Sequence, residues 1–298
     1  MRLDPILAET VAAVLDEGTF DAAARRLHVT PSAVSQRVKT LEEDLGRVLL
    51  VRSKPVRATE AGEAVARFGR QISLLERDTI AGFGLAADGG ETDVRIRVPL
   101  AVNADSMATW FLPPLARIAQ LHRVEFDLHR DDQSFTARLL ESGTVMAAVT
   151  SESVPVGGCT VAGLGSLRYV PVATREYRDR WFSRGLTSDA LATAPFVDFD
   201  RRDSLQHDWL RARDVDPWSV PRHYVPASHD FAVAVRLGLG WGLLPVVQAE
   251  PALVSGELVR LDDSETAVPL FWQQWNLRSP LLDAIAGEVR DHASLLLR

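Results

Sequence analysis

The 298-residue sequence contains one cysteine, Cys159, and no run of 18 uncharged apolar residues. A single cysteine cannot form a disulfide within the chain, which fits a reducing compartment. Without a long apolar run we expect no membrane-spanning helix, and acidic residues in the apolar stretch near the N-terminus argue against a secretory signal. No group of cysteines and histidines has metal-ligand spacing, so we expect neither a metal nor another cofactor. Together these absences favour a cytoplasmic protein.

The motifs of several common enzyme classes are also missing. The sequence has no G-x-S-x-G, no Walker phosphate loop, no G-x-G-x-x-G and no H-E-x-x-H. The glycine-rich segment GLGWG at 238–242 lacks the phosphate-loop pattern. We therefore expect a protein that is not an enzyme.

Lysine is scarce, and the only two lysines lie within one basic segment, residues 25–57. This segment has eight basic and three acidic residues, a net charge of +5 in a chain whose formal net charge is −7. A basic island on an acidic protein indicates a surface that binds nucleic-acid phosphates. The eight residues are Arg25, Arg26, Arg37, Lys39, Arg47, Arg52, Lys54 and Arg57.

Within this segment, VTPSAVSQRVKTLEEDLG (residues 29–46) predicts an amphipathic helix. Val34, Val38 and Leu41 recur at helical spacing on one face. The opposite face is small, polar and basic, which lets the backbone approach a major groove while longer side chains reach base edges. An ordinary solvated helix face is the alternative. The residues that we expect to contact DNA from this helix and its cap are Thr30, Pro31, Ser32, Ser35, Gln36, Arg37 and Lys39.

The flanking segments extend this pattern on both sides. GTFDAAARRLHV predicts a second short helix, separated from the first only by His28 and Val29, and this arrangement is a helix-turn-helix. His28 stands where glycine is common. After the helix, LLVRSKPVRA predicts a small β-wing, from which Arg52, Lys54 and Arg57 would contact phosphates.

The stretch FDAAARRLHVTPSAVSQRVKTLEEDLGRVLLVRS, followed by ATEAGE, closely resembles the winged helix-turn-helix of LysR-type transcriptional regulators. LAVNADSMATWFLPPL, SGTVMAAVTSE and SGELVRL are similar to the ArgP/LysG branch of that family, also called chromosome initiation inhibitor. The resemblance implies an activator or repressor that binds promoter operator DNA as a homodimer or homotetramer. An activator would also contact RNA polymerase. In this branch, the resemblance further implies lysine or arginine as effector and an amino-acid exporter gene as target.

We expect three parts: a winged helix-turn-helix domain (1–58), a linker helix and hinge (59–90) and an effector-binding domain (91–298). In the linker, apolar residues alternate spacings of four and three, which is the pattern of a coiled coil. A helix packed on its own domain is the alternative. The residues that we expect to pair with a second chain are Val65, Phe68, Ile72 and Leu75. The sequence ADGGE at 87–91 predicts the hinge.

The remainder alternates strand-like segments, such as VEFDLHR (124–130), with helical ones, such as SMATWFLPPLARIAQL (106–121). This alternation predicts α/β subdomains with largely parallel sheets. The resemblance implies two lobes like those of periplasmic binding proteins: lobe I, about 91–160 plus 268–298, and lobe II, about 161–267. The fold class is therefore α+β overall, with a mostly helical N-terminal domain. A solute-binding receptor would share the two lobes, but it would need a secretory signal and would have no use for a winged helix.

In such sheets, ligands bind outside the carboxyl ends of strands. Hydroxyls and helix-start amides suit a carboxylate, and aspartates suit an ammonium or guanidinium group. Each residue can instead be an ordinary helix cap. Two arginines in FDRRDS would weaken a site for a cation, so a different small-molecule effector is the alternative. The expected effector-binding residues are Asn103, Asp105, Ser106, Asp132, Thr150, Ser151, Asp200, Ser228 and Asp230.

Overall fold

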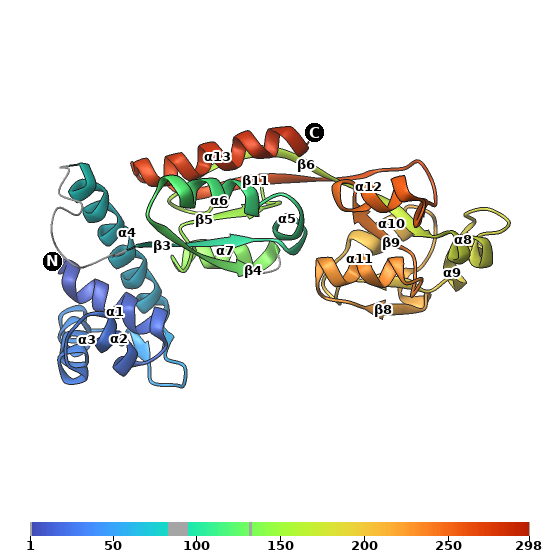
Figure 1. The fold of residues 1–298 in the computed structure, drawn as a ribbon. Helices are drawn as coiled ribbons and strands as arrows, with labels where there is room; N and C mark the ends of the chain where they lie inside the picture. The colour runs from blue at the N-terminus through green and yellow to red at the C-terminus, as the bar shows by residue number, and fades with distance from the viewer. Residues whose placement is uncertain (1, 83–94, 131–132, 298) are drawn as a thin grey trace.

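The computed structural model describes residues 2–82, 95–130 and 133–297. An N-terminal helical unit is followed by a long helix, α4, and then by two lobes (Figure 1). The predicted hinge at 87–91 and the candidate residue Asp132 lie outside the described ranges. Among the described residues we find no helix that could span a membrane.

The N-terminal unit is a winged helix-turn-helix, as predicted. Val34, Val38 and Leu41 are buried in its core, and the Thr30 hydroxyl accepts a hydrogen bond from the backbone N–H of Ala33 at 3.2 Å. His28 adopts a φ of 54°, so the turn has the left-handed conformation that glycine commonly supplies. The elements are α1 (Pro5–Glu17), α2 (Phe20–Arg26), α3 (Pro31–Leu45), β1 (Leu50–Val51) and β2 (Arg57–Ala58).

Helix α4 (Glu60–Gly82) follows Thr59, whose hydroxyl accepts from the backbone N–H of Gly62 at 3.1 Å. Its first half packs on α1. Val65 is buried in the core of the N-terminal unit, and Phe68 packs against that core. The alternative of a helix packed on its own domain therefore applies to Val65, which is buried, whereas Phe68 is only half-buried.

The lobes lie at one side of the N-terminal unit and are joined by two long strands, β6 (Cys159–Thr174) and β11 (Thr266–Trp275) (Figure 1). Lobe I contains β3 (Ile96–Val102), α5 (Ala104–Thr109), α6 (Leu112–Leu121), β4 (Val124–Arg130), α7 (Gln133–Glu141), β5 (Ala147–Thr150) and α13 (Pro280–Leu296). Lobe II contains α8 (Arg175–Trp181), α9 (Ser188–Thr193), β7 (Phe196–Asp198), α10 (Leu205–Arg211), β8 (Arg222–Tyr224), α11 (Ser228–Arg236), β9 (Gly242–Pro245), α12 (Val246–Ser255) and β10 (Leu258–Arg260).

The main sheet is mixed, with strand order β10-β6-β11-β5-β3-β4 and with β9 also paired to β6. Strand β3 pairs in parallel with β4 and β5, whereas β6 and β11 pair antiparallel with each other and with their other neighbours. The expectation of largely parallel sheets was wrong for these two strands. The chain leaves lobe I along β6 and returns along β11, so the two must run in opposite directions.

Candidate functional site

On the predicted DNA-contacting face of α3, some side chains are exposed and others contact residues of the protein itself. Ser32 and Gln36 are exposed. Arg37 is half-buried, and its Nη1 donates to the Thr10 hydroxyl of α1 at 3.5 Å, so this guanidinium is directed toward its own unit. Lys39 is exposed beside Glu43, at 3.5 Å.

The remaining predicted DNA contacts lie at the cap, in α3 and in the wing. Thr30 and Pro31 are exposed, and Ser35 is half-buried. The side chains of the three wing residues, Arg52, Lys54 and Arg57, are exposed.

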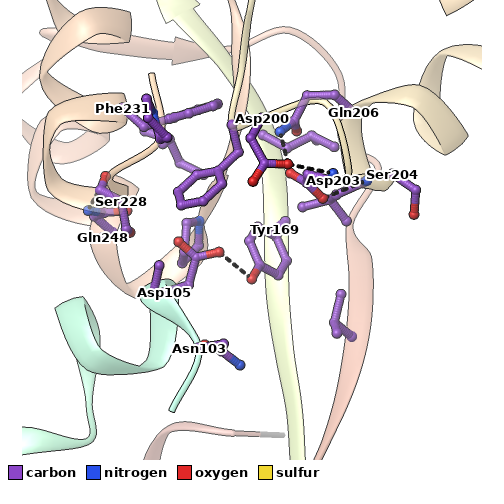
Figure 2. A pocket seen from close by; sticks show the side chains of 18 of the residues that line it. Asn103, Asp105, Tyr169, Asp200, Asp203, Ser204, Gln206, Ser228, Phe231 and Gln248 are labelled. Atoms are coloured by element: carbon purple, nitrogen blue, oxygen red, sulfur yellow. Dashed lines mark hydrogen bonds between the residues drawn. The ribbon is translucent and has the colours of Figure 1, made fainter. Parts of the chain in front are cut away.

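A cavity of about 330 Å³ lies between the two lobes (Figure 2). Lobe I contributes Asn103 and Asp105 from the β3–α5 junction, and the spanning strands contribute Tyr169 and Val268. Lobe II closes the other side with residues of the β7–α10 loop and of three helices. These include Phe199, Asp200, Arg202, Asp203, Ser204, Gln206, Ser228, Phe231 and Gln248.

Asp105 lies in the first turn of α5 and accepts a hydrogen bond from the Tyr169 hydroxyl at 2.7 Å (Figure 2). Burial raises the pKa of the Asp105 carboxyl, while the hydroxyls of Ser228 and Tyr169 oppose that rise. Burial and the adjacent Asp105 also raise the pKa of Tyr169 well above its usual value. A buried carboxylate that borders a cavity is stabilised by a cationic ligand, because an unpaired buried charge costs several kcal/mol.

Asp200 and Asp203 belong to the loop between β7 and α10. Asp200 Oδ1 accepts backbone hydrogen bonds from Arg202 at 2.7 Å and from Asp203 at 3.0 Å. Burial raises the pKa of Asp203 to about 6; the backbone bond from Leu205 lowers it, and the nearby carboxylates of Asp105, Asp198 and Asp200 raise it. These aspartates therefore cap the turn and also direct negative charge into the cavity.

Two buried side-chain oxygens at the cavity, Gln206 Oε1 and Gln248 Oε1, have no hydrogen-bond partner among the described residues. A buried polar atom left unsatisfied costs about 1–3 kcal/mol. A ligand with hydrogen-bond donors would satisfy them.

Four of the predicted effector-binding residues line this cavity: Asn103, Asp105, Asp200 and Ser228. Ser106 is fully buried and does not line it. The Asn103 side chain accepts a hydrogen bond from the Ser106 backbone N–H at 2.7 Å, so Asn103 is also the N-cap of α5.

The structure does not bring Thr150, Ser151 or Asp230 into the cavity. The Thr150 hydroxyl accepts from the backbone N–H of Glu152 at 3.1 Å and thus caps the turn after β5. Asp230 is exposed, because it lies two residues after Ser228 on α11 and so projects from a different helix face.

Tyr169, Gln206, Phe231 and Gln248 line the cavity and were not expected. Gln248 lies in the first turn of α12, which follows the carboxyl end of β9, and that signal in the sequence was overlooked. Tyr169 lies within a strand, where no local pattern distinguishes a cavity residue from a core residue. Cys159, the single cysteine, is half-buried, and burial raises its thiol pKa, which disfavours a reactive thiolate.

Comparison with known proteins decides the family. Residues 7–63 match the profile described as "Bacterial regulatory helix-turn-helix protein, lysR family", and residues 93–294 match the "LysR substrate binding domain". The chain belongs to the LysR family. As a LysR-family protein it is a transcriptional regulator with the fold class predicted from its sequence.

Three relatives are similar over the full length of this LysR-family chain. The crystal structure of ArgP from Mycobacterium tuberculosis is 45% identical, with 100% and 99% of the two chains covered and a TM-score of 0.87. The structure of LysG from Corynebacterium glutamicum with bound effector Arg is 37% identical, covers 99% and 100%, and has a TM-score of 0.78. The lysine export transcriptional regulatory protein LysG of Corynebacterium efficiens is 41% identical over 298 residues, covering 99% of this chain and 100% of the relative.

Proposed function

We propose that this regulator binds operator DNA through α3 and the wing, and that it binds a basic amino acid between its two lobes. Lysine and arginine are the proposed effectors, and a gene for basic amino-acid export is the proposed target. The protein would act in the cytoplasm as a homodimer or homotetramer, and it would contact RNA polymerase where it activates.

The observation that carries the effector proposal is the set of carboxylates at the cavity. Asp105, Asp200 and Asp203 approach it from both lobes, whereas Arg130 and Arg202 are the cations of its lining. Arg202 is close to Asp200, with 3.6 Å between Nη2 and Oδ2. The cavity lining therefore carries more negative than positive groups, which suits a ligand with two cationic groups and one carboxylate.

Arg130 and Asn103, on the lobe I side, would receive the effector carboxylate. Asp105 and Asp203 would receive its two cationic groups, and Gln206 and Gln248 would accept further N–H hydrogen bonds. The name of the C. efficiens relative and the arginine bound to the C. glutamicum LysG support the same class of effector. A LysR-family regulator with another small-molecule effector remains the second candidate, favoured by the two arginines of the lining.

Calorimetry with lysine, arginine and leucine tests this proposal. We expect lysine and arginine to bind the parent protein and leucine to bind far more weakly. Asp105→Asn should reduce lysine affinity by about tenfold or more, since it removes a charge-assisted contact worth about 1.5–3 kcal/mol. Leucine that binds as tightly as lysine would exclude a basic amino acid as the specific effector.

A further inference from the structure

Helix α4 is attached rigidly to the N-terminal unit. Its Val65 and Ala66 are buried in the core of that unit. At Gly69 the backbones of α4 and α1 touch, since a Cβ there would lie 2.6 Å from the carbonyl oxygen of Ala8. The first half of α4 and the DNA-binding helices therefore form one body.

The same stretch of α4 also holds lobe I through two arginines. Arg67 donates to the carbonyl oxygens of Gly157, at 2.9 Å, and Glu141, at 3.3 Å. One turn later, Arg70 donates to the carbonyl of Gly143 at 3.0 Å and pairs with Asp16 of α1 at 2.5 Å. Arg67 thus connects two separate segments of lobe I to the helix that carries the DNA-binding unit.

Two glycines in lobe I give Arg67 the space that it needs. Gly143 has a φ of 70°, and a Cβ there would lie 2.6 Å from the Cβ of Arg67. Gly158 has a φ of 75°, and a Cβ there would lie 2.9 Å from the Arg67 guanidinium. Because any larger residue would displace Arg67, the contact is closely fitted.

The loop that Arg67 contacts is tied to the strands that join the lobes. Gln273 of β11 accepts from the backbone N–H of Val156 and donates to the carbonyls of Glu152 and Val154, each at 3.0 Å. The loop leads directly into β6, which carries Tyr169 at the interlobe cavity. A change in how the lobes close would therefore be transmitted along β6 and β11 to the carbonyl of Gly157.

Next to these contacts, a second cavity of about 740 Å³ separates the N-terminal unit from lobe I, and its lining includes Arg70 and Arg77 of α4. Its lining includes Arg57 and Ala58 of the wing and Arg97 and Asp127 of lobe I. This cavity leaves space for the N-terminal unit to tilt against lobe I. The orientation of the N-terminal unit therefore depends on the contacts that α4 makes with lobe I.

We infer that Arg67 is a positioning residue that sets the orientation of the N-terminal unit on lobe I and so couples effector binding to DNA binding. The orientation role needs no ligand, whereas the coupling role rests on the proposed function. Arg77, on the same helix, makes no hydrogen bond or ion pair with any described residue, so Arg77→Gln is a matched control for the loss of a charge.

Electron–electron distance measurements on the ligand-free protein test the orientation. The spin labels are placed at Val48 and Leu121, whose side chains are 64% and 74% exposed. They are attached to genetically encoded keto side chains, so that Cys159 is not modified. Dilution with unlabelled protein removes the distances between labels on different chains. We expect one narrow distribution of label-to-label distances in the parent. In Arg67→Gln this distribution should be shifted or broadened. Arg77→Gln should match the parent, and Arg67→Lys should be intermediate, because an ammonium cannot reproduce the planar fork of a guanidinium. A parent-like distribution in Arg67→Gln would overturn the inference.

The coupling is measured as the ratio of DNA Kd values without and with saturating lysine, on a duplex selected with the parent. We expect the effect of lysine on the DNA Kd to be smaller in Arg67→Gln than in the parent by a factor of about three or more. The lysine Kd of the DNA-free variant should stay within about twofold of the parent value. An unchanged ratio would contradict the coupling role. If lysine and arginine fail to bind the parent, the proposed effector is wrong, and the distance distributions still decide whether Arg67 sets the orientation.

Discussion

The hydroxyl of Tyr169 donates a 2.7 Å hydrogen bond to Oδ2 of Asp105 and so joins a strand that spans both lobes to the first turn of α5. Burial raises the pKa of Asp105, and this bond opposes that rise. The negative charge available to a cationic effector therefore depends on a residue 64 positions further along the chain.

Replacement of Tyr169 by phenylalanine should weaken lysine binding by about tenfold, because a hydrogen bond to a charged group contributes about 1.5–3 kcal/mol. The pKa of Asp105 would rise further without the bond, so part of the lost affinity should return at higher pH. Calorimetry at two pH values measures both effects. Tyr224→Phe, which alters an exposed tyrosine outside the cavity, is the control. Parent-like lysine binding by Tyr169→Phe would show that this bond does not support the effector site.

The pKa of Asp203 is raised from 3.8 to about 6, so the free energy of unfolding should depend on pH in this range. The folded chain retains a proton that the unfolded chain releases, so the stability from this group is complete below about pH 4 and is lost as pH rises through 6. Denaturant unfolding should therefore show that the parent loses stability relative to Asp203→Asn between these two pH values.

The Asp203 carboxyl should also make lysine binding depend on pH. Lysine affinity should rise with pH, whereas the folding stability from this group falls. Below about pH 6 the carboxyl is protonated, so the affinity for lysine should fall by up to about tenfold per pH unit. Asp203→Asn should bind lysine weakly with a flatter pH profile, and the exposed Asp189→Asn should follow the parent. A parent profile as flat as that of Asp203→Asn would remove Asp203 from the effector site.

Gln36 should contribute to the choice of DNA sequence, because it is exposed on α3 and its amide can form two hydrogen bonds with one base. Gln36→Ala should cost about 1–3 kcal/mol on the preferred operator and much less on other DNA. Lys54→Ala should weaken binding to all sequences alike and reduce the salt slope by about one. Binding to selected and scrambled duplexes over a range of salt measures both. Unchanged sequence preference in Gln36→Ala would show that this residue does not read bases.

The dimer interface should lie in the later part of α4. Ile72 and Leu75 are half-buried and belong to neither main core, unlike Val65. Replacement of both Ile72 and Leu75 by aspartate should separate the chains, since carboxylates would then be buried without partners. Light scattering gives the mass, and circular dichroism verifies the fold. Val254→Asp, at a side chain that is 84% exposed, is the control. A double variant with the parent mass would refute the predicted linker dimer.

The sequence alone determined the features that lie within one element or between neighbours in the chain. The stripe of α3, its Thr30 cap and the tight turn at His28 are set by side-chain periodicity and by local backbone preferences. The same holds for β4, whose predicted range, 124–130, agrees with the structure. The predicted helix over 106–121 was the exception, since the chain breaks at Trp110 and Phe111 between α5 and α6.

The tertiary structure decided which of the candidate residues meet. Asp105, Tyr169, Asp203 and Gln248 come from four separate elements or loops, and no local pattern predicts that they share a cavity. It also decided that Val65 packs within its own chain, because a heptad spacing specifies an apolar face of a helix but not the surface that covers it. Side chains that converge from distant segments depend on how those segments pack, and packing is a property of the whole folded chain.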